Sequence, residues 1–96
     1  MENQEVEKVA GLLKTMAHPI RLKILCLLLD EEMTVGEIRD HVKTTNANVS
    51  QHLTILRNKN IISFRKEANF IYNMISDDRM HELISTMKKL FCEEEE

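Results

Sequence analysis

The chain has 96 residues, of which 43% are hydrophobic and 30% charged, and it contains two glycines, one proline and two cysteines. A chain of this length forms one domain with a modest core, so we take residues 1–96 as a single domain. No apolar run approaches the roughly 20 residues of a membrane span, and the acidic start "MENQEVEKVA" does not resemble a signal peptide. We therefore expect a cytoplasmic protein without membrane contacts, in a compartment where thiols are normally reduced.

The net charge of −3 is unevenly distributed along the chain. Residues 39–67 carry six basic and two acidic side chains, a balance of +4. Residues 1–38 carry four against seven (−3), and residues 68–96 carry three against seven (−4). A basic centre between acidic ends is typical of a small DNA-binding domain. The alternative is an ordinary mixed, solvated surface.

The first 30 residues predict two helices. Residues 4–15 place apolar side chains at helical spacing, which indicates an amphipathic helix. Pro19 suits the first turn of a second helix, with His18 just outside it. The stretch "LKILCLLLD", with Cys26 in its middle, is apolar almost all round, as expected for a central helix.

The middle of the chain predicts a helix-turn-helix. Thr34 and Glu37 have the spacing of a capping box at the start of a short helix over residues 35–42. The polar residues "KTTN" then turn the chain, and Thr45 can cap a second helix that runs to Asn58. A short helix, a tight turn and a helix with a polar outer face make up this motif.

The segment "IISFRKEANFIYNMIS" predicts a β-hairpin. Asn69 is the best candidate for a left-handed turn residue, and a hairpin in this position is the wing of a winged helix. Ser76 is the predicted N-cap of a last amphipathic helix. The fold class is therefore mainly α with a small β-hairpin, a winged helix-turn-helix in the order α-α-α-α-β-β-α.

The first and last helices each carry an apolar stripe that a three-helix core cannot easily bury. We therefore expect a two-fold homodimer through these two helices. Paired recognition helices one DNA turn apart would fit a palindromic operator in double-stranded DNA.

Four stretches carry a resemblance to the ArsR/SmtB family of bacterial repressors along nearly the whole chain. They are "LLKTMAHPIRLKILCLLL", "MTVGEI", "NVSQHLTILRNKNII" and "RKEANFIYNMIS". The resemblance implies a dimeric winged-helix repressor that leaves its operator when an inducer binds. The chain carries no set of nucleophile, base and orienting residue, so we do not expect an enzyme.

The family divides by its sensing site, and two kinds of metal site are known among its members. Many metal-sensing members carry a cysteine pair in the first helix of the helix-turn-helix, where this chain reads "TVGEIRD" without a thiol, and soft metals favour thiolate ligands. The first half of a zinc site could come from Asp77, Asp78 and His81. A second half is missing unless Glu93 and the residues after it contribute, so we predict no metal or other cofactor, with a zinc-type inducer as an alternative.

The two cysteines resemble those of the SqrR/BigR/HlyU-like branch. The segments "ILCLLLDEEMTVGE" and "KKLFCEEEE" match that branch, as does the wing "RKEAN". The resemblance implies that reactive sulfur species or an oxidant link Cys26 to Cys92, by a disulfide or a polysulfide, and that the link lowers DNA affinity. The alternative is that Cys26 is a buried hydrophobe and Cys92 an incidental terminal residue.

Thiolate population sets the order of reaction that we expect at this pair. Lys88 and Lys89 favour a thiolate at Cys92, while Glu93 and the three glutamates that follow oppose it. Cys26, in an apolar setting, should be a poor thiolate. We expect Cys92 to react first and Cys26 to resolve the product.

The predicted DNA contacts come from the second helix of the motif and from the basic side chains around it. The expected base-reading residues are Asn46, Ala47, Ser50, Gln51 and Thr54. The expected phosphate partners are Arg39, Lys43, Arg65 and Lys66. His52 lies beside the apolar stripe, where packing or hydrogen bonding is favoured over base contact. The alternative from another class is a winged-helix module that binds protein.

Overall fold

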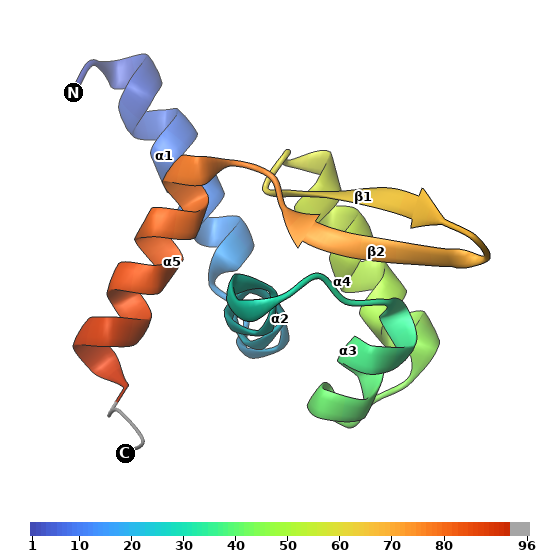
Figure 1. The fold of residues 1–96 in the computed structure, drawn as a ribbon. Coiled ribbons are helices and arrows are strands. Elements are labelled where there is room, and N and C mark those ends of the chain that lie inside the picture. The colour runs from blue at the N-terminus through green and yellow to red at the C-terminus, as the bar shows by residue number, and fades with distance from the viewer. Residues whose placement is uncertain (93–96) are drawn as a thin grey trace.

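The computed structural model describes residues 1–92, which form five α-helices and one antiparallel hairpin (Figure 1). The elements are α1 (Asn3–Met16), α2 (Pro19–Asp30), α3 (Val35–Val42), α4 (Asn46–Asn58), β1 (Ile62–Glu67), β2 (Phe70–Ile75) and α5 (Asp78–Phe91). This order confirms the predicted winged helix-turn-helix. Within the described part of the chain, no helix is both long and apolar enough to cross a membrane.

Three helices begin where their capping residues predict. His18 caps α2 through a side-chain nitrogen that accepts a backbone hydrogen bond. At the start of α3, Thr34 Oγ1 accepts from the Glu37 N–H (3.2 Å) and Glu37 Oε1 accepts from the Thr34 N–H (2.9 Å). Thr45 Oγ1 accepts from the Asn48 N–H (3.1 Å) at the start of α4. Each bond satisfies a backbone donor that the helix itself leaves without a partner.

The predicted N-cap of the last helix is wrong by one residue. Asp77, not Ser76, caps α5, and its carboxylate accepts a hydrogen bond from the Arg79 N–H at 2.8 Å. The Ser76 N–H donates to the carbonyl oxygen of Ile61 at 3.2 Å. Ser76 is therefore still held in the extended end of the hairpin, and the helix begins only after it.

The predicted left-handed residue of the hairpin turn is also wrong. Ala68, not Asn69, has a positive φ, of 56°. The strands pair as far as Glu67 with Phe70, so only two residues form the turn. Both common two-residue hairpin turns need a positive φ at their first central position, and that position is occupied by Ala68.

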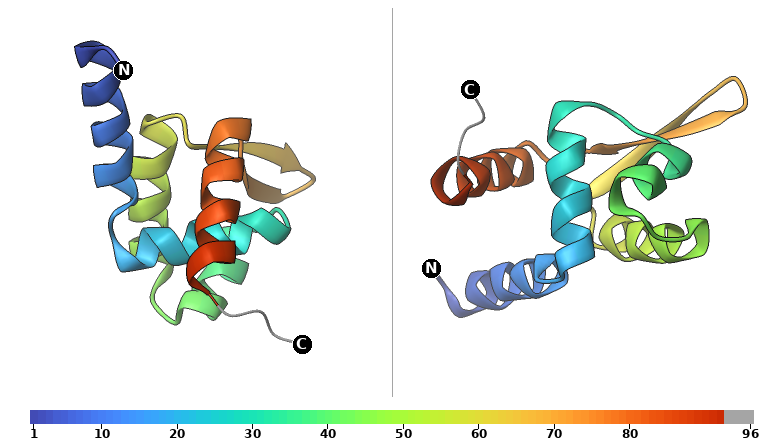
Figure 2. Two further views of the ribbon diagram at one scale, coloured as in Figure 1. Left: turned by 90° about the vertical axis from the view of Figure 1, so that its left-hand side faces the viewer. Right: turned by 90° about the horizontal axis from the view of Figure 1, so that it is seen from below.

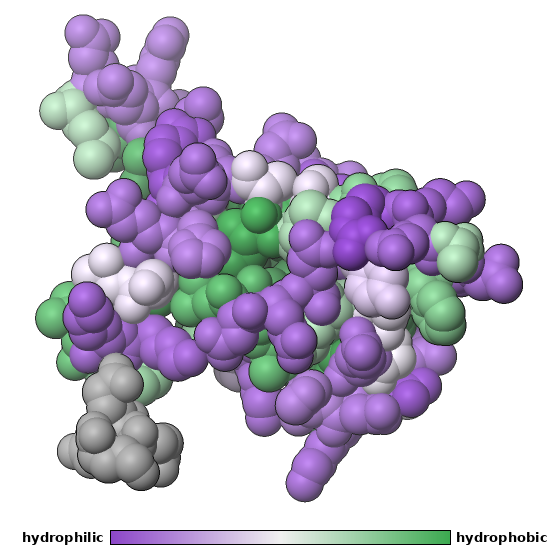
Figure 3. Space-filling model, in the orientation of Figure 1, coloured by the Kyte–Doolittle hydropathy of each residue, from purple (hydrophilic) through white to green (hydrophobic). Residues whose placement is uncertain are grey.

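Helix α2 lies at the centre of the molecule, with Ile24 and Leu25 fully buried. Val49, Leu53 and Leu56 form the inner face of α4 and are buried, as predicted. Figure 2 shows α1 and α5 on one side of α2 and the helix-turn-helix with its wing on the other. In Figure 3 a hydrophobic area lies between α5 and the hairpin, bordered by polar side chains.

A buried asparagine anchors the hairpin to the helices. Asn73 in β2 is 1% exposed and exchanges two backbone hydrogen bonds with Met33, of 2.7 and 3.1 Å. Its Nδ2 donates to the Met33 carbonyl oxygen (3.1 Å), and its Oδ1 accepts from Arg57 of α4 (3.3 Å). The base of the wing is thereby fixed to α4 and to the chain between α2 and α3.

Candidate DNA-binding surface and thiol groove

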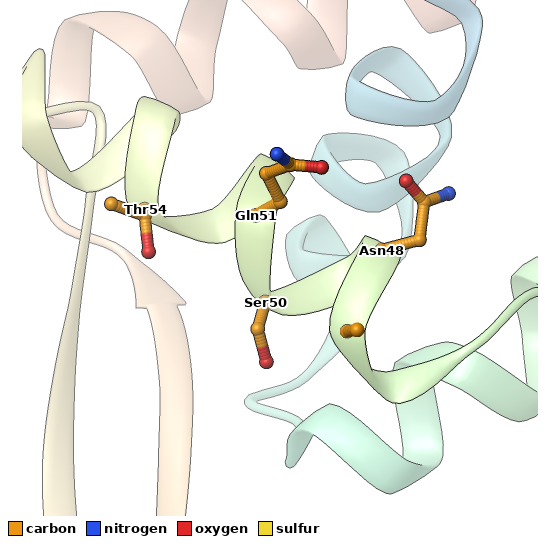
Figure 4. A pocket seen from close by; sticks show the side chains of 5 residues that line it. Asn48, Ser50, Gln51 and Thr54 are labelled. Atoms are coloured by element: carbon orange, nitrogen blue, oxygen red, sulfur yellow. The ribbon is translucent and has the colours of Figure 1, made fainter.

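The outer face of α4 presents small polar side chains around a shallow concavity. The concavity is lined by Ala47, Asn48, Ser50, Gln51 and Thr54. In Figure 4 Ser50 and Thr54 point to one side of the helix, and Asn48 and Gln51 point to the other. Four of these residues were predicted to read bases, and the structure places all four together on the exposed surface. Asn48 also lines the concavity and was not predicted; its Nδ2 donates a hydrogen bond to Thr44 Oγ1 at 3.0 Å.

The fifth predicted base-reading residue, Asn46, makes a side-chain hydrogen bond within the protein. Asn46 Oδ1 accepts a hydrogen bond from Arg39 Nη1 at 2.9 Å, which joins α3 to the first turn of α4. Arg39 also forms an ion pair with Asp40 at 2.9 Å. Lys43 ends α3 in a left-handed conformation with φ of 65°, and its side chain is exposed. Arg39 thus positions the turn, whereas Lys43 extends from it.

Of the two predicted phosphate partners on the wing, Arg65 is paired with carboxylates and, within residues 1–92, Lys66 is not. Arg65 Nε lies 2.6 Å from Glu32 Oε1, a second nitrogen pairs with Glu67, and its guanidinium lies 4.8 Å from the Tyr72 ring centre. Lys66 is exposed and makes no ion pair with another residue of 1–92. Its charge is therefore more readily available to a ligand than that of Arg65.

A hydrogen-bonded cluster supports the recognition helix from behind. His52 is 8% exposed, and its Nδ1 accepts a bond from Arg21 Nε at 3.2 Å. Arg21 Nη1 also donates to the Thr15 carbonyl oxygen at 2.7 Å, and the His18 ring centre lies 4.5 Å from that of His52. Burial, His18 and the Arg21 charge lower the pKa of His52. His52 therefore has the hydrogen-bonding position that we expected.

The two cysteines line a single groove. Helix α5 packs beside α2 and encloses with it an apolar groove of about 330 Å³. The lining residues are Leu22, Lys23, Cys26, Ile84, Met87, Lys88, Phe91 and Cys92. Cys26 is half-buried, Cys92 is exposed, and both are free thiols. The fold thus brings together two thiols that lie far apart in the sequence.

The surroundings of Cys26 disfavour its thiolate. Burial raises the pKa of the Cys26 thiol, the Lys88 charge opposes that rise, and Cys92 and Asp30 add to it. Lys88 is itself partly engaged, because its Nζ lies 3.9 Å from Asp30 Oδ2. Cys92 ends α5, where its N–H donates to the Lys88 carbonyl oxygen at 2.9 Å. The terminal glutamates expected to oppose a Cys92 thiolate lie outside the described residues.

The candidate zinc ligands are not assembled into a site in the described part of the chain. Asp77 pairs with Arg79 at 2.7 Å, and these hydrogen bonds lower the pKa of Asp77 to about 2. Over residues 1–92, no three His, Cys, Asp or Glu side chains lie close enough to hold a metal ion. Glu93 and the residues after it, which could supply the second half of a zinc site, lie outside the described residues.

Comparison with known proteins shows the family. The model of the bacterial regulatory proteins of the arsR family matches residues 18–63, from the cap of α2 into β1. The transcriptional activator HlyU of Vibrio cholerae is 37% identical to this chain, over 97% of this chain and 90% of HlyU. The chain belongs to the ArsR family. The predicted family resemblance is therefore confirmed.

Solved structures of this family agree with the fold. Reduced HlyU from Vibrio cholerae superposes with a TM-score of 0.89 at 36% identity, over 94% of this chain and 95% of that one. The transcriptional repressor BigR from Xylella fastidiosa superposes with a TM-score of 0.86 at 29% identity, over 97% and 94%. The ArsR-family chain is thus a DNA-binding transcriptional regulator of the HlyU and BigR branch and not an enzyme.

Proposed function

We propose that this ArsR-family protein is a cytoplasmic, dimeric repressor whose operator affinity falls when Cys26 and Cys92 are linked. The observation that supports the proposal is the common groove of the two thiols between α2 and α5. A direct disulfide needs Cα atoms within about 7 Å of each other, and additional bridging sulfur atoms relax that limit.

The linkage requires a sulfur donor or an oxidant. With a persulfide R–S–SH, Cys92 takes the outer sulfur and releases R–SH, which leaves Cys92–S–SH. The Cys26 thiolate then attacks the inner sulfur, expels HS⁻ and forms the disulfide. If Cys26 is also converted to a persulfide, the two groups condense to a trisulfide with loss of H₂S. An oxidant instead accepts the two electrons and two protons of the paired thiols.

The link would act through α2. This helix packs against α3 and α4 on one side and against α5 on the other. Joining Cys26 to Cys92 would hold α5 against α2 and change the spacing of the two recognition helices in the dimer. The free-energy change required is small, because about 1.4 kcal/mol changes affinity tenfold.

DNA recognition would divide between α4 and the basic side chains around it. Ala47, Ser50, Gln51 and Thr54 would face base edges, where Gln51 has the geometry for a bidentate contact with adenine. The phosphate contacts would come from Lys43 and Lys66, and from Arg39 and Arg65 after exchange of their carboxylate partners. Two such recognition helices, one from each protomer and about 34 Å apart, would fit a palindromic operator.

The test combines mass spectrometry with operator binding. The reduced protein is treated with an organic persulfide, the Cys26–Cys92 species is identified by mass, and its operator affinity is measured by fluorescence anisotropy. We expect a linked intramolecular species and at least tenfold weaker binding, restored by reductant.

The control variants separate a switch from incidental thiols. Cys92→Ser should bind operator like the reduced wild type and should no longer respond to persulfide. A full response in Cys92→Ser, or unmodified thiols in the wild type, would contradict the proposal. A regulator with a zinc-type inducer or with no inducer would then be favoured.

A further inference from the structure

The groove that contains the two thiols is larger and more apolar than a small polar oxidant needs. Its walls are formed by Leu22, Ile84, Met87 and Phe91, with Cys26 half-buried among them. Its volume of about 330 Å³ lies near the lower end of the roughly 300–1,000 Å³ that is usual for small-molecule sites. A small oxidant such as hydrogen peroxide would leave most of this apolar surface uncovered.

Within residues 1–92, the charged side chains that line the groove are both basic. Lys23 of α2 and Lys88 of α5 both belong to its lining. Lys23 makes no ion pair with another residue of 1–92, and Lys88 has only the 3.9 Å contact with the exposed Asp30. Two ammonium groups beside an apolar groove complement a ligand that has a hydrocarbon body and an anionic group.

Two exposed leucines of α5 lie outside the groove, whereas Phe91, 83% exposed, belongs to its lining. Leu83 and Leu90 are 37% and 71% exposed and do not line the groove. At 3.6 residues per turn they lie roughly 100–120° round the helix from Ile84, which forms the groove wall. A dimer that buries Leu83 and Leu90 against α1 of a second copy would therefore contact a face of α5 that is turned away from Ile84.

We infer that the groove between α2 and α5 binds an amphipathic anion, namely a hydrocarbon chain that carries a carboxylate. The inducer is then a member of this class, a fatty-acid hydroperoxide. The inference rests on the proposed dithiol function. The chain occupies the apolar walls, the carboxylate pairs with Lys23 and Lys88, and the peroxide lies beside the thiols. The Cys92 thiolate takes the distal peroxide oxygen, and proton uptake gives the fatty alcohol and Cys92 sulfenic acid. Cys26 then attacks that sulfur, which forms the disulfide and releases water.

Decanoate, which cannot oxidise thiols, tests the binding step. Its binding to the reduced full-length protein is measured by titration calorimetry and by protection of the cysteines from maleimide. We expect saturable binding and slower labelling. The double variant Lys23→Gln/Lys88→Gln should bind about tenfold more weakly, the size of effect that two solvent-exposed charge contacts give. In calorimetry, Lys89→Gln, which removes a neighbouring α5 charge outside the groove lining, should bind decanoate like the wild type.

Three outcomes would overturn the inference. They are the absence of saturable decanoate binding, equal affinity for uncharged decanol and decanoate, and cysteine labelling that falls as protein concentration rises. The last outcome would assign the groove to a second copy of the chain.

The oxidation step separates this inference from the proposed function. Linoleic acid hydroperoxide should link the thiols faster than hydrogen peroxide at equal concentration, and decanoate should slow only the former. If both peroxides link Cys26 to Cys92 equally and release DNA, the dithiol switch stands and the ligand class is wrong. If decanoate binds but no oxidant links the thiols, the groove stands and the switch is wrong.

Discussion

At the scale of single residues, buried polar side chains hold the DNA-binding helix in place. His52 and Arg21 join α4 to α2, and Arg21 reaches on to the last turn of α1 through Thr15. Asn73 performs the same task for the wing. A buried polar group is stabilising only while its hydrogen bonds are made, so these positions are sensitive to protonation and to substitution.

The pH dependence of folding should report on His52. Its pKa is lowered in the folded state, so the unfolded chain binds more protons than the folded one below the ordinary histidine value of about 6.5. Stability from this residue is therefore present above that value and is lost as pH falls. We expect urea unfolding at lower concentration at pH 5.5 than at pH 7.5. His52→Gln should reduce the difference, and exposed His41→Gln should retain it. An unchanged difference in His52→Gln would contradict this account.

At the scale of elements, the recognition helix and the wing have different tasks. The α4 face carries uncharged hydrogen-bonding groups, whereas Lys43 and Lys66 extend from the turn and the wing. Base contacts distinguish sequences, while phosphate contacts bind all sequences and depend on salt. The two groups should therefore be separable by measurement.

Two substitutions test this division. Gln51→Ala should weaken operator binding by about 1–3 kcal/mol and have little effect on random DNA. Lys66→Gln should weaken binding to operator and to random DNA alike. It should also reduce the magnitude of the slope of log K against log salt by about 1. Lys14→Gln, in the last turn of α1 and not among the expected DNA contacts, is the control and should leave both affinities unchanged. Equal loss on operator and random DNA in Gln51→Ala would contradict a base-reading role.

At the scale of the whole molecule, the N-terminal part of α1 stands away from the core, while Met16 at its end is buried. Every residue from 1 to 10 is exposed, and Val6 and Leu13 are 47% and 46% exposed despite their apolar side chains. Helix α5, which carries the exposed Leu83 and Leu90, lies on the same side of α2 as α1 in the right-hand view of Figure 2. An apolar surface of this kind is expected to pair with a second copy.

Dimerisation should therefore depend on α1. Val6→Asp combined with Leu13→Asp should shift the protein toward monomer in sedimentation velocity and weaken binding to a palindromic operator. The side chains are already exposed, so thermal unfolding of the monomer should remain cooperative. Phe70→Asp at the tip of the wing introduces the same charge at an exposed apolar residue and should leave the dimer intact. If the Val6→Asp/Leu13→Asp variant remained dimeric, the dimer interface would lie elsewhere on the molecule.

The sequence alone determined most of the elements, because the signals concerned are local. Thr34 with Glu37, Thr45 and Pro19 mark helix starts through bonds within a few residues, and the period of the apolar side chains separates helix from strand. The same locality explains both errors. Ser76 has the side chain of an N-cap but is held by Ile61, and the geometry of a two-residue turn, not side-chain preference, places the positive φ at Ala68.

Only the tertiary structure decided which distant residues meet. Nothing near Arg21 in the sequence indicates His52, and nothing near Arg65 indicates its pairing with Glu32. Asn73 interrupts a run of β-forming residues, which was a signal, but its partners Met33 and Arg57 lie far along the chain. The shared groove of Cys26 and Cys92 likewise depends on how α5 packs against α2. Long-range contacts of this kind depend on the packing of the whole core, whereas a cap or a periodic stripe depends on a few neighbouring residues.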